Sequence, residues 1–210
     1  IHKGKYLSKK EFILKLQEIN EFFNISEENI LRYVFYTMCL CSLIILSKPI
    51  YFNIKKYIIQ VKLEYDWSRI KNNKQVNRYN SSIYPVGKIT INSANIESII
   101  SSGFLEKTLP VSIAHIPNTS KPGESGNICL AAHRDTFFKN LIFVNINDLI
   151  MIEHLAGIDE YLVQDIKVID PSETNYIYEY NYDKLTLLTC YPFDYFGNAP
   201  YRYLIVAKKI

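Results

Sequence analysis

Residues 184–193 read KLTLLTCYPF, a segment that joins a strand-forming run to a reactive side chain. The run 185–189 favours a β-strand because it alternates Leu and Thr residues that suit a pleated surface. Pro192 ends any central strand, since it has no backbone N–H to donate. Cys190 is therefore predicted at the end of a strand and beside a loop, where a rigid element can hold a thiol within reach of solvent.

The chain from residue 86 onward shows the same pattern. Turn signals rich in Gly, Pro and Asn separate a series of short β-type runs at residues 88–91, 127–132, 149–154, 161–169, 184–190 and 203–207. No long helical pattern lies between these runs, which argues against a doubly wound α/β sheet. Roughly 130 residues suffice for one packed core. We therefore predict a mainly β domain at residues 83–210, closed into a barrel.

The first 80 residues differ in charge from the rest. They hold 14 Lys and Arg against 7 Asp and Glu, whereas the remaining residues hold 10 against 14. The formal net charge of +3 thus hides a basic segment followed by an acidic one, and it gives no reason to expect a nucleic-acid partner. With 48% hydrophobic residues, the chain is neither disordered nor collagen-like.

Helical segments are predicted ahead of the β domain. Residues 1–29 contain an amphipathic helix from about residue 9 to residue 23, introduced by the capping-box pattern of Ser8 and Glu11. Residues 30–52 surround the uncharged run YVFYTMCLCSLIILS at 33–47, bracketed by Arg32 and Lys48. We interpret this segment as a single membrane anchor that also meets lipid head groups through its flanking basic residues. A buried helix of a soluble domain is the alternative interpretation.

Residues 53–82 are predicted to form a juxtamembrane helix and a polar linker that begins near residue 71. The helix is favoured by apolar residues at helical spacing. An alternating set in the same segment also fits a strand, namely Ile59, Val61, Leu63, Tyr65 and Trp67. The helical set comprises Ile54, Tyr57, Ile58, Val61 and Tyr65.

Two more reactive side chains stand at predicted strand ends. His133 follows the run 127–132, and Arg202 opens the last strand. A Cys, a His and an Arg at one rim of a barrel permit covalent acyl transfer, with a thiolate nucleophile, a proton carrier and a donor to the oxyanion. Their spacing alone is weak evidence, because unrelated Cys and His residues occur in many β domains.

The sequence segments around these residues resemble the signature motifs of the sortase family. HRDTFF stands at 133–138, TLLTCYPF at 186–193 and APYR at 199–202, preceded by HIPNT at 115–119 and PGESGN at 122–127. In this order, over roughly residues 84–210, the segments are most similar to class D sortases. Ala132 departs from the Gly that this class often has before the His.

The resemblance implies an eight-stranded β-barrel and a single-pass, membrane-bound cysteine transpeptidase of Gram-positive bacteria, with its catalytic domain on the extracellular side. Such an enzyme cleaves an LPxTG-like sorting signal after Thr and transfers the acyl group to an amine, typically on a peptidoglycan precursor. It implies that Cys190 is the nucleophile, that His133 exchanges protons with the amines, and that Arg202 holds the substrate and its oxyanion.

Three further residues are assigned supporting roles. His115 is expected to form a structural hydrogen bond at a loop rather than to transfer protons. Asp135 could orient His133, but an exposed loop carboxylate is the simpler interpretation, because side chains two apart point the same way only if the strand continues. Thr189 should face the opposite side of its strand from Cys190. No cofactor and no metal are expected, since the Cys and His residues lack a metal-binding spacing.

Two other functions stay open at this point. A cysteine protease would use the same groups and release the acyl group to water. His133 precedes Cys190 by 57 residues, which is nearer the order of caspases, but the Q-A-C-x-G context is absent. A non-catalytic, membrane-tethered peptide-binding barrel would keep its function without the Cys190 thiol.

Overall fold

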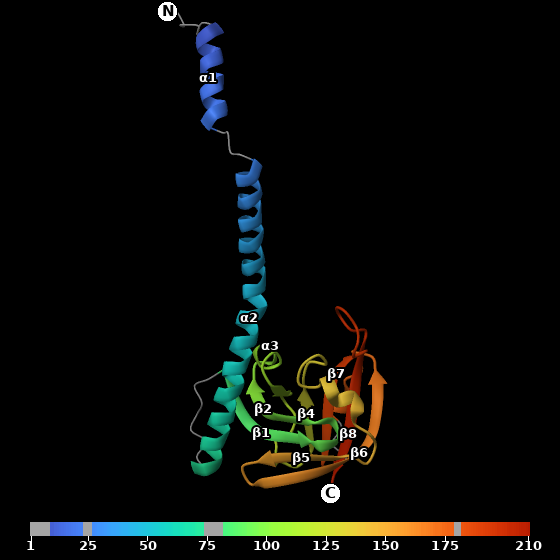
Figure 1. Cartoon of the computed structure of the whole chain (residues 1–210). Coiled ribbons are helices and arrows are strands. Elements are labelled where there is room, and N and C mark those ends of the chain that lie inside the picture. Colours follow the sequence, from blue (N-terminus) through green and yellow to red (C-terminus); the bar gives the residue numbers. More distant parts are fainter. Residues whose placement is uncertain (1–8, 23–26, 74–81, 179–181) are drawn as a thin grey trace, which may run out of the picture. The chain divides into compact units, whose positions relative to one another are not determined.

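The structure is a computed structural model that describes residues 9–22, 27–73, 82–178 and 182–210. Its elements are α1 (Lys9–Phe22), α2 (Glu27–Asn73), β1 (Ile83–Ile91), η1 (Asn92–Ala94), β2 (Ile96–Gly103), α3 (Leu105–Thr108), β3 (Ile113–His115), β4 (Asn127–Ala131), η2 (Lys139–Phe143), β5 (Leu149–His154), β6 (Gly157–Ile169), α4 (Asn175–Tyr178), β7 (Lys184–Tyr191) and β8 (Tyr201–Lys209) (Figure 1). The chain divides into two compact units, Ile1–Asn53 and Ile54–Ile210, and the boundary falls within α2.

The eight strands close into a barrel in the order β1-β2-β3-β4-β7-β8-β6-β5. β2 runs parallel to β3, and β4 runs parallel to β7, whereas the other neighbours are antiparallel. β1 and β5 complete the closure through pairs such as Ile89 with Ile152. The predicted mainly β barrel is confirmed, and it contains two strands, β2 and β3, that lie outside the predicted runs.

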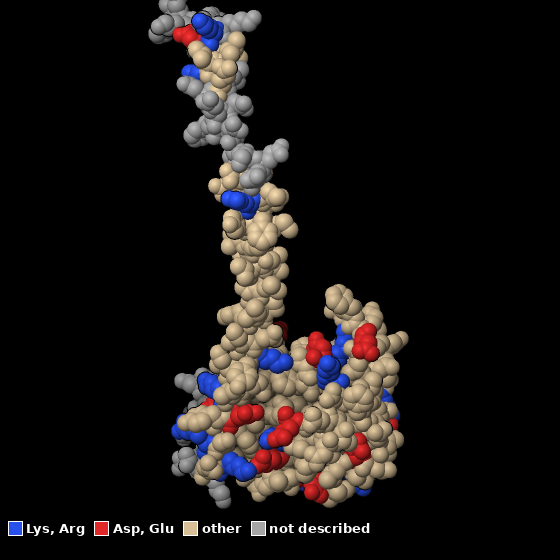
Figure 2. All heavy atoms as spheres, viewed as in Figure 1, with Lys and Arg blue, Asp and Glu red and all other residues tan. Residues whose placement is uncertain are grey.

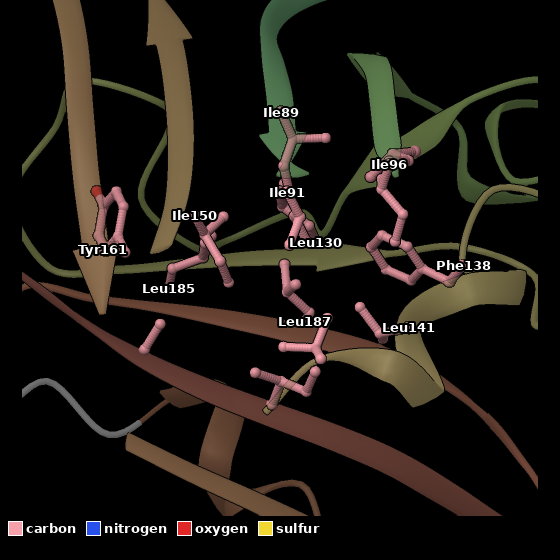
Figure 3. Packing of buried hydrophobic residues seen from close by; sticks show 14 of the residues in the cluster. Ile89, Ile91, Ile96, Leu130, Phe138, Leu141, Ile150, Tyr161, Leu185 and Leu187 are labelled. Atoms are coloured by element: carbon pink, nitrogen blue, oxygen red, sulfur yellow. The ribbon is translucent and has the colours of Figure 1, made fainter. Parts of the chain in front are cut away.

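Aliphatic side chains from most of the strands fill the barrel (Figure 3). On β1, the buried Ile89 and Ile91 alternate with partly exposed residues, as a strand with one face in the core requires. Phe138 and Leu141, which follow β4, are fully buried in the same core. Their burial fixes the segment that leads away from His133, because an aromatic and an aliphatic anchor hold it to the barrel interior.

α1 confirms the first predicted helix as far as Phe22. Ser8, Phe23 and residues 74–81 of the predicted linker lie outside the described residues. α2 continues without interruption through Pro49, so the predicted anchor and the predicted juxtamembrane helix form one helix. α2 contains a stretch that is long and apolar enough to cross a membrane, and none of that stretch is buried. Figure 2 shows much of this stretch as uncharged surface.

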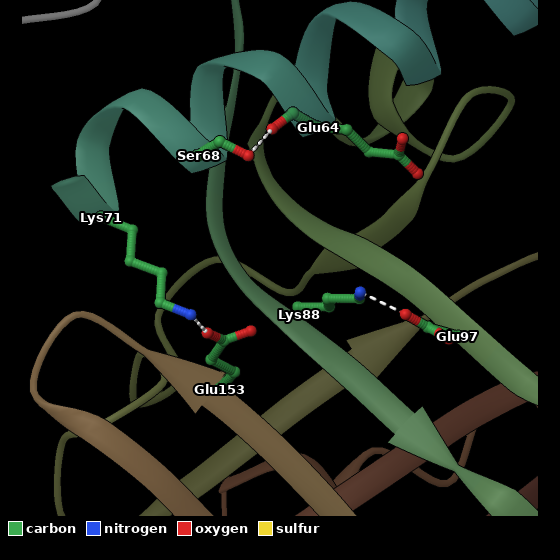
Figure 4. A network of polar contacts seen from close by, with 6 residues as sticks. All are labelled: Glu64, Ser68, Lys71, Lys88, Glu97 and Glu153. Carbon is green, nitrogen blue, oxygen red and sulfur yellow. Dashed lines mark hydrogen bonds and ion pairs between the residues drawn. The ribbon is translucent and has the colours of Figure 1, made fainter.

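The last part of α2 packs on the barrel through one stripe of side chains. Leu63 and Trp67 are buried against Ile99 of β2, and the Gln60 amide donates a hydrogen bond to the Val111 carbonyl. Farther along, Lys71 forms an ion pair with Glu153 of β5, while Lys88 and Glu97 join β1 to β2 (Figure 4). These contacts make residues 54–73 part of the same unit as the barrel.

The side chains of α2 that pack on the barrel are not the ones from which the helix at residues 53–82 was predicted. The helix is confirmed, but the residues at helical spacing on which it was predicted are exposed, namely Ile54, Tyr57, Ile58, Val61 and Tyr65. The barrel instead contacts residues that were also compatible with a strand, including Leu63 and Trp67. The helix carries apolar residues on two faces, and contact with β1 and β2 selects which of them is buried.

Candidate active site

Cys190 stands near the end of β7 and is partly exposed. Earlier on the same strand, Leu185 and Leu187 lie in the barrel core, and Thr189 continues this buried series. Since successive side chains of a strand point to opposite faces, Cys190 lies on the outer face of the barrel wall. The burial of Thr189 and the partial exposure of Cys190 agree with the expectation that the two face opposite sides.

Arg202 lies directly opposite Cys190 in the antiparallel pairing of β7 with β8. Side chains of residues opposite one another across such a pair share one face of the sheet. The Arg202 Nη1 donates hydrogen bonds to the carbonyl oxygens of Ala199, at 3.2 Å, and Tyr201, at 2.9 Å. Within the described part of the chain, the other guanidinium nitrogens donate no hydrogen bond and form no ion pair, although the Asp170 carboxylate interacts with Arg202 electrostatically. These nitrogens can therefore donate to an oxygen of a ligand.

His133 reaches the same level of the barrel from the other side of β7. β4 pairs with β7 up to Ala131 and Leu188, and the Ala132 N–H then donates to the Leu188 carbonyl at 3.3 Å. Extending this register by two residues past the Ala131–Leu188 pair, beyond the end of β4, brings the backbone of His133 level with Cys190. Cys190 and Arg202 thus lie on adjacent strands, and His133 lies two residues past the end of β4, the strand on the other side of β7.

Backbone contacts on both sides fix the position of His133. The Thr189 hydroxyl donates to the Ala132 carbonyl at 2.7 Å, which ties β7 to the residue before His133. The His133 carbonyl accepts hydrogen bonds from the N–H groups of Thr136 and of the buried Phe138. The imidazole itself is exposed, and it forms no hydrogen bond or ion pair with any described residue. A fixed backbone with a free imidazole suits a group that must meet a substrate.

His115 is not part of this group of residues. It is buried on β3, where it pairs with Leu130 of β4. Leu130 lies three residues before His133 in the sequence. Its Nε2 lies 3.0 Å from the Ser120 carbonyl oxygen, which can only accept, so Nε2 carries the proton and donates. Burial lowers the pKa of His115, an effect that outweighs the hydrogen bonds to Ser120 and Thr119. These contacts fit the expected structural role at the 116–120 loop.

Asp135 is exposed on the turn after His133. Among the described residues it forms no hydrogen bond or ion pair, so no such contact links its carboxylate to the imidazole of His133. Of the two interpretations open for Asp135, the structure favours the exposed loop carboxylate.

Arg134 was not predicted from the sequence. Its Nη2 donates to the carbonyl oxygens of Tyr195, at 2.5 Å, and Gly197, at 3.0 Å. Its guanidinium carbon also lies 5.7 Å from the centre of the Tyr195 ring. No sequence pattern connects residue 134 with residue 195, and the only available signal is that Arg134 follows His133 directly.

An aromatic cluster supports the end of β7. The rings of Tyr191 and Tyr203 are stacked with centroids 6.0 Å apart, and Phe193 meets Tyr203 edge to face at 5.2 Å. Burial raises the pKa of Tyr203, and the nearby Tyr191 adds to this. Phe193 and Tyr203 also pack against the barrel core. The residues that follow Cys190 are therefore held by packing on the barrel.

A family model of the sortase domain matches residues 89–210, a range that contains His133, Cys190 and Arg202. The chain belongs to the sortase family. Among curated proteins, sortase D of Bacillus subtilis (strain 168) is 33% identical over 125 residues. The match covers 59% of this chain and 63% of that relative, so the chain spans less than two thirds of the relative's length.

Solved sortase structures share this fold. A Clostridium perfringens sortase D5 transpeptidase matches with a TM-score of 0.61 over 74% of this chain and 98% of that one. At 24% identity, this match is a likeness of fold alone. Streptococcus agalactiae sortase C1 matches with a TM-score of 0.56 and 34% identity, over 60% of this chain and 67% of that one. The closed barrel is thus the sortase fold.

The barrel of this sortase holds a second thiol in a different environment. Cys129 on β4 is buried, and its Sγ lies 3.7 Å from the Ile177 carbonyl of α4. Burial raises the pKa of Cys129 to about 12. Because the thiolate is the nucleophilic form, Cys129 is inert near neutral pH. Cys190 is the partly exposed thiol of the barrel and the one placed to react.

Proposed function

We propose that this protein is a class D sortase that acts as a cysteine transpeptidase on LPxTG-like sorting signals. The observation that supports the proposal is the pairing of Cys190 with Arg202 across β7 and β8, with His133 just past the end of the neighbouring β4, all within the range that matches the sortase domain. In this proposal, the partly exposed thiol of Cys190 and the guanidinium nitrogens of Arg202 that donate to no described residue act on the same peptide carbonyl.

In the proposed reaction, the Cys190 thiol gives its proton to His133, and the resulting thiolate attacks the Thr carbonyl of the sorting signal. The oxyanion that develops accepts hydrogen bonds from the free guanidinium nitrogens of Arg202. The C–N bond then breaks, and the leaving amine takes a proton from His133, which leaves a thioester on Cys190. An incoming amine loses a proton to His133, attacks the thioester and releases the Cys190 thiolate with a new amide bond.

The proposed setting is the cell membrane of a Gram-positive bacterium. The apolar stretch of α2 supports a single-pass anchor, since it is long enough to span a bilayer and its side chains are exposed. The barrel would work on the extracellular side, where sorting signals of surface proteins and the amine of a peptidoglycan precursor meet. Lipid head groups would contact the basic residues that flank the anchor.

Intact-mass spectrometry of the full chain in detergent micelles tests this proposal. The chain is incubated with a set of LPxTG-type peptides, with and without triglycine as an amine. We expect an acyl adduct on Cys190 that triglycine discharges into a ligated peptide. Cys190→Ala should give no adduct, whereas the matched control Cys129→Ala should still give one, because Cys129 lies in the wall away from the site.

The alternatives give different masses. An adduct that water discharges as fast as triglycine does would indicate a cysteine protease. Absence of an adduct across all peptides, with binding that survives Cys190→Ala, would indicate a peptide-binding barrel.

A further inference from the structure

We propose that Arg134 is a positioning residue that holds the loop between β7 and β8 against the segment that carries His133. This inference rests on the proposed function, because its catalytic consequence requires an acyl transfer at Cys190. The loop, residues 192–200, joins the strand of Cys190 to the strand of Arg202. A contact from Arg134 to this loop therefore links the segment of His133 to the connection between Cys190 and Arg202.

The loop has few other polar supports. Within the described residues, its carbonyls accept side-chain hydrogen bonds from two arginines only, Arg134 at Tyr195 and Gly197, and Arg202 at Ala199. No backbone hydrogen bond joins the loop to another part of the described chain. Residues 194–198 are exposed, and Phe196 is exposed over its whole side chain. The loop tip is thus held by Arg134 rather than by packing.

Arg134 is well suited to hold two carbonyls at once. One nitrogen, Nη2, donates to both carbonyl oxygens, and the guanidinium plane also lies against the Tyr195 ring. Hydrogen bonds from a charged donor are stronger than neutral ones, and the cation–π contact adds to them. The second nitrogen, Nη1, is covered and has no partner among the described residues. The side chain therefore gives up hydration to make these contacts.

The contact links the two segments on either side of Cys190. Arg134 follows His133 directly, and its own segment is anchored by the buried Phe138. Through Arg134 the loop is fastened to this anchored segment, so the approach to the thiol has a fixed shape. Without Arg134 the loop tip would move freely, and the sorting signal would meet Cys190 in many orientations, which lowers the rate of acylation.

Limited proteolysis tests the physical contact without relying on catalysis. The full chain in detergent micelles is treated briefly with chymotrypsin, and mass spectrometry measures cleavage after Tyr195 and Phe196 relative to cleavage after the exposed Tyr182. Arg134→Met, which keeps the length but loses the donors, should raise this ratio on the order of tenfold. Arg134→Lys, which keeps one charged nitrogen, should give an intermediate ratio.

Kinetics test the consequence. We expect Arg134→Met to lower kcat/KM for an acylating peptide by about tenfold or more, with Arg134→Lys in between. Alkylation of Cys190 by iodoacetamide, a reagent too small to need the loop, should change by less than about twofold. The matched control is Arg69→Met, since Arg69 also lies over a tyrosine ring, Tyr65, but makes no hydrogen bond within the described chain. Arg69→Met should change neither kcat/KM nor the rate of Cys190 alkylation.

An unchanged cleavage ratio in Arg134→Met would overturn the inference. A raised ratio with unchanged kcat/KM would show that Arg134 holds the loop without positioning the reaction, which overturns the catalytic part. If the unmodified chain forms no adduct with any peptide, the proposed function fails, and the cleavage ratio still decides whether Arg134 holds the loop.

Discussion

Thr189 and Cys190 are neighbours in sequence that serve different purposes. Thr189 is buried, and its hydroxyl fastens β7 to the backbone beside His133. Cys190 faces outward and is paired across the ladder with Arg202. The alternation of a β-strand thus separates a fixing contact from a reactive group within two residues. A substrate can reach the thiol without disturbing the hydrogen bond that positions the imidazole segment.

Arg202→Lys is expected to impair turnover without changing the reactivity of the thiol. The Arg202 Nη1 already bonds two backbone carbonyls, which leaves the other guanidinium nitrogens for an oxyanion. A lysine offers one ammonium group and cannot serve both tasks. We expect kcat/KM to fall on the order of 100-fold, while iodoacetamide alkylates Cys190 within about twofold of the original rate. A large drop in alkylation would contradict this division of roles.

His115 is expected to make stability depend on pH. Burial lowers its pKa in the folded chain, so the unfolded chain binds a proton first as the pH falls below about 6.5. Neutral His115 makes its full contribution to the free energy of unfolding above about pH 6.5, and this contribution is lost as the pH falls toward the pKa of His115 in the folded chain. Urea unfolding at pH 8 to pH 5 should show a shallower decline for His115→Gln than for the unmodified chain. Equal declines would show that His115 is not responsible.

At the level of elements, strands with a clear apolar pattern could be predicted and the others could not. β4, β7 and β8 were predicted within two residues at each end, and their strand ends located His133, Cys190 and Arg202. β2 was missed because its buried positions include Ser98 and Ser101, which interrupt the apolar signal. β3 has only three residues and forms through its pairing with β2 and β4.

The same limit applies to the site. The pairing of Cys190 with Arg202 depends on strand register, and the contact of Arg134 with Tyr195 depends on the shape of a loop. Neither register nor loop shape can be derived from spacing within one sequence. Contacts that depend on the closed barrel, such as these two, therefore could not be predicted from the sequence.

The packing of α2 on the barrel predicts that part of this helix stabilises the catalytic unit. Leu63 is 3% exposed against Ile99, whereas Tyr57 on the same helix is 71% exposed. Leu63→Ala should lower the free energy of unfolding by about 2–4 kcal/mol. Tyr57→Ala, the matched control, should change it by less than about 0.5 kcal/mol. Urea unfolding followed by Trp67 fluorescence measures both, and equal effects would show that the helix does not support the barrel.

At the scale of the whole molecule, the two halves differ in charge and in surface. The first 80 residues carry 14 Lys and Arg against 7 Asp and Glu, and the rest carry 10 against 14. The uncharged stretch of α2 separates basic residues on either side of it (Figure 2). This distribution is the one expected of a basic membrane-attached segment that carries an acidic domain in solvent.

Charges placed within the apolar stretch should release the chain from membranes. Ile44→Arg combined with Ile45→Arg costs roughly 5–7 kcal/mol of insertion free energy on the translocon scale. Fractionation should move the double variant to the soluble fraction, whereas Val61→Arg with Tyr65→Arg, outside the predicted anchor, should stay with membranes. Labelling of Cys190 by a membrane-impermeant maleimide on intact cells then reports the side on which the barrel lies. An unlabelled Cys190 would contradict the extracellular placement.

Closure of the barrel limits how an extended peptide can bind. Many proteins capture such peptides by adding them as a further strand at a sheet edge, where backbone hydrogen bonds accept almost any sequence. Here each described strand has a hydrogen-bonded neighbour on both sides, so no strand of the wall offers its whole edge for a peptide to join. An extended peptide therefore finds only short unpaired stretches of strand backbone, such as β1 before Lys88 on its β5 side, and further binding must come from side chains and loops, which depend on the identity of its residues.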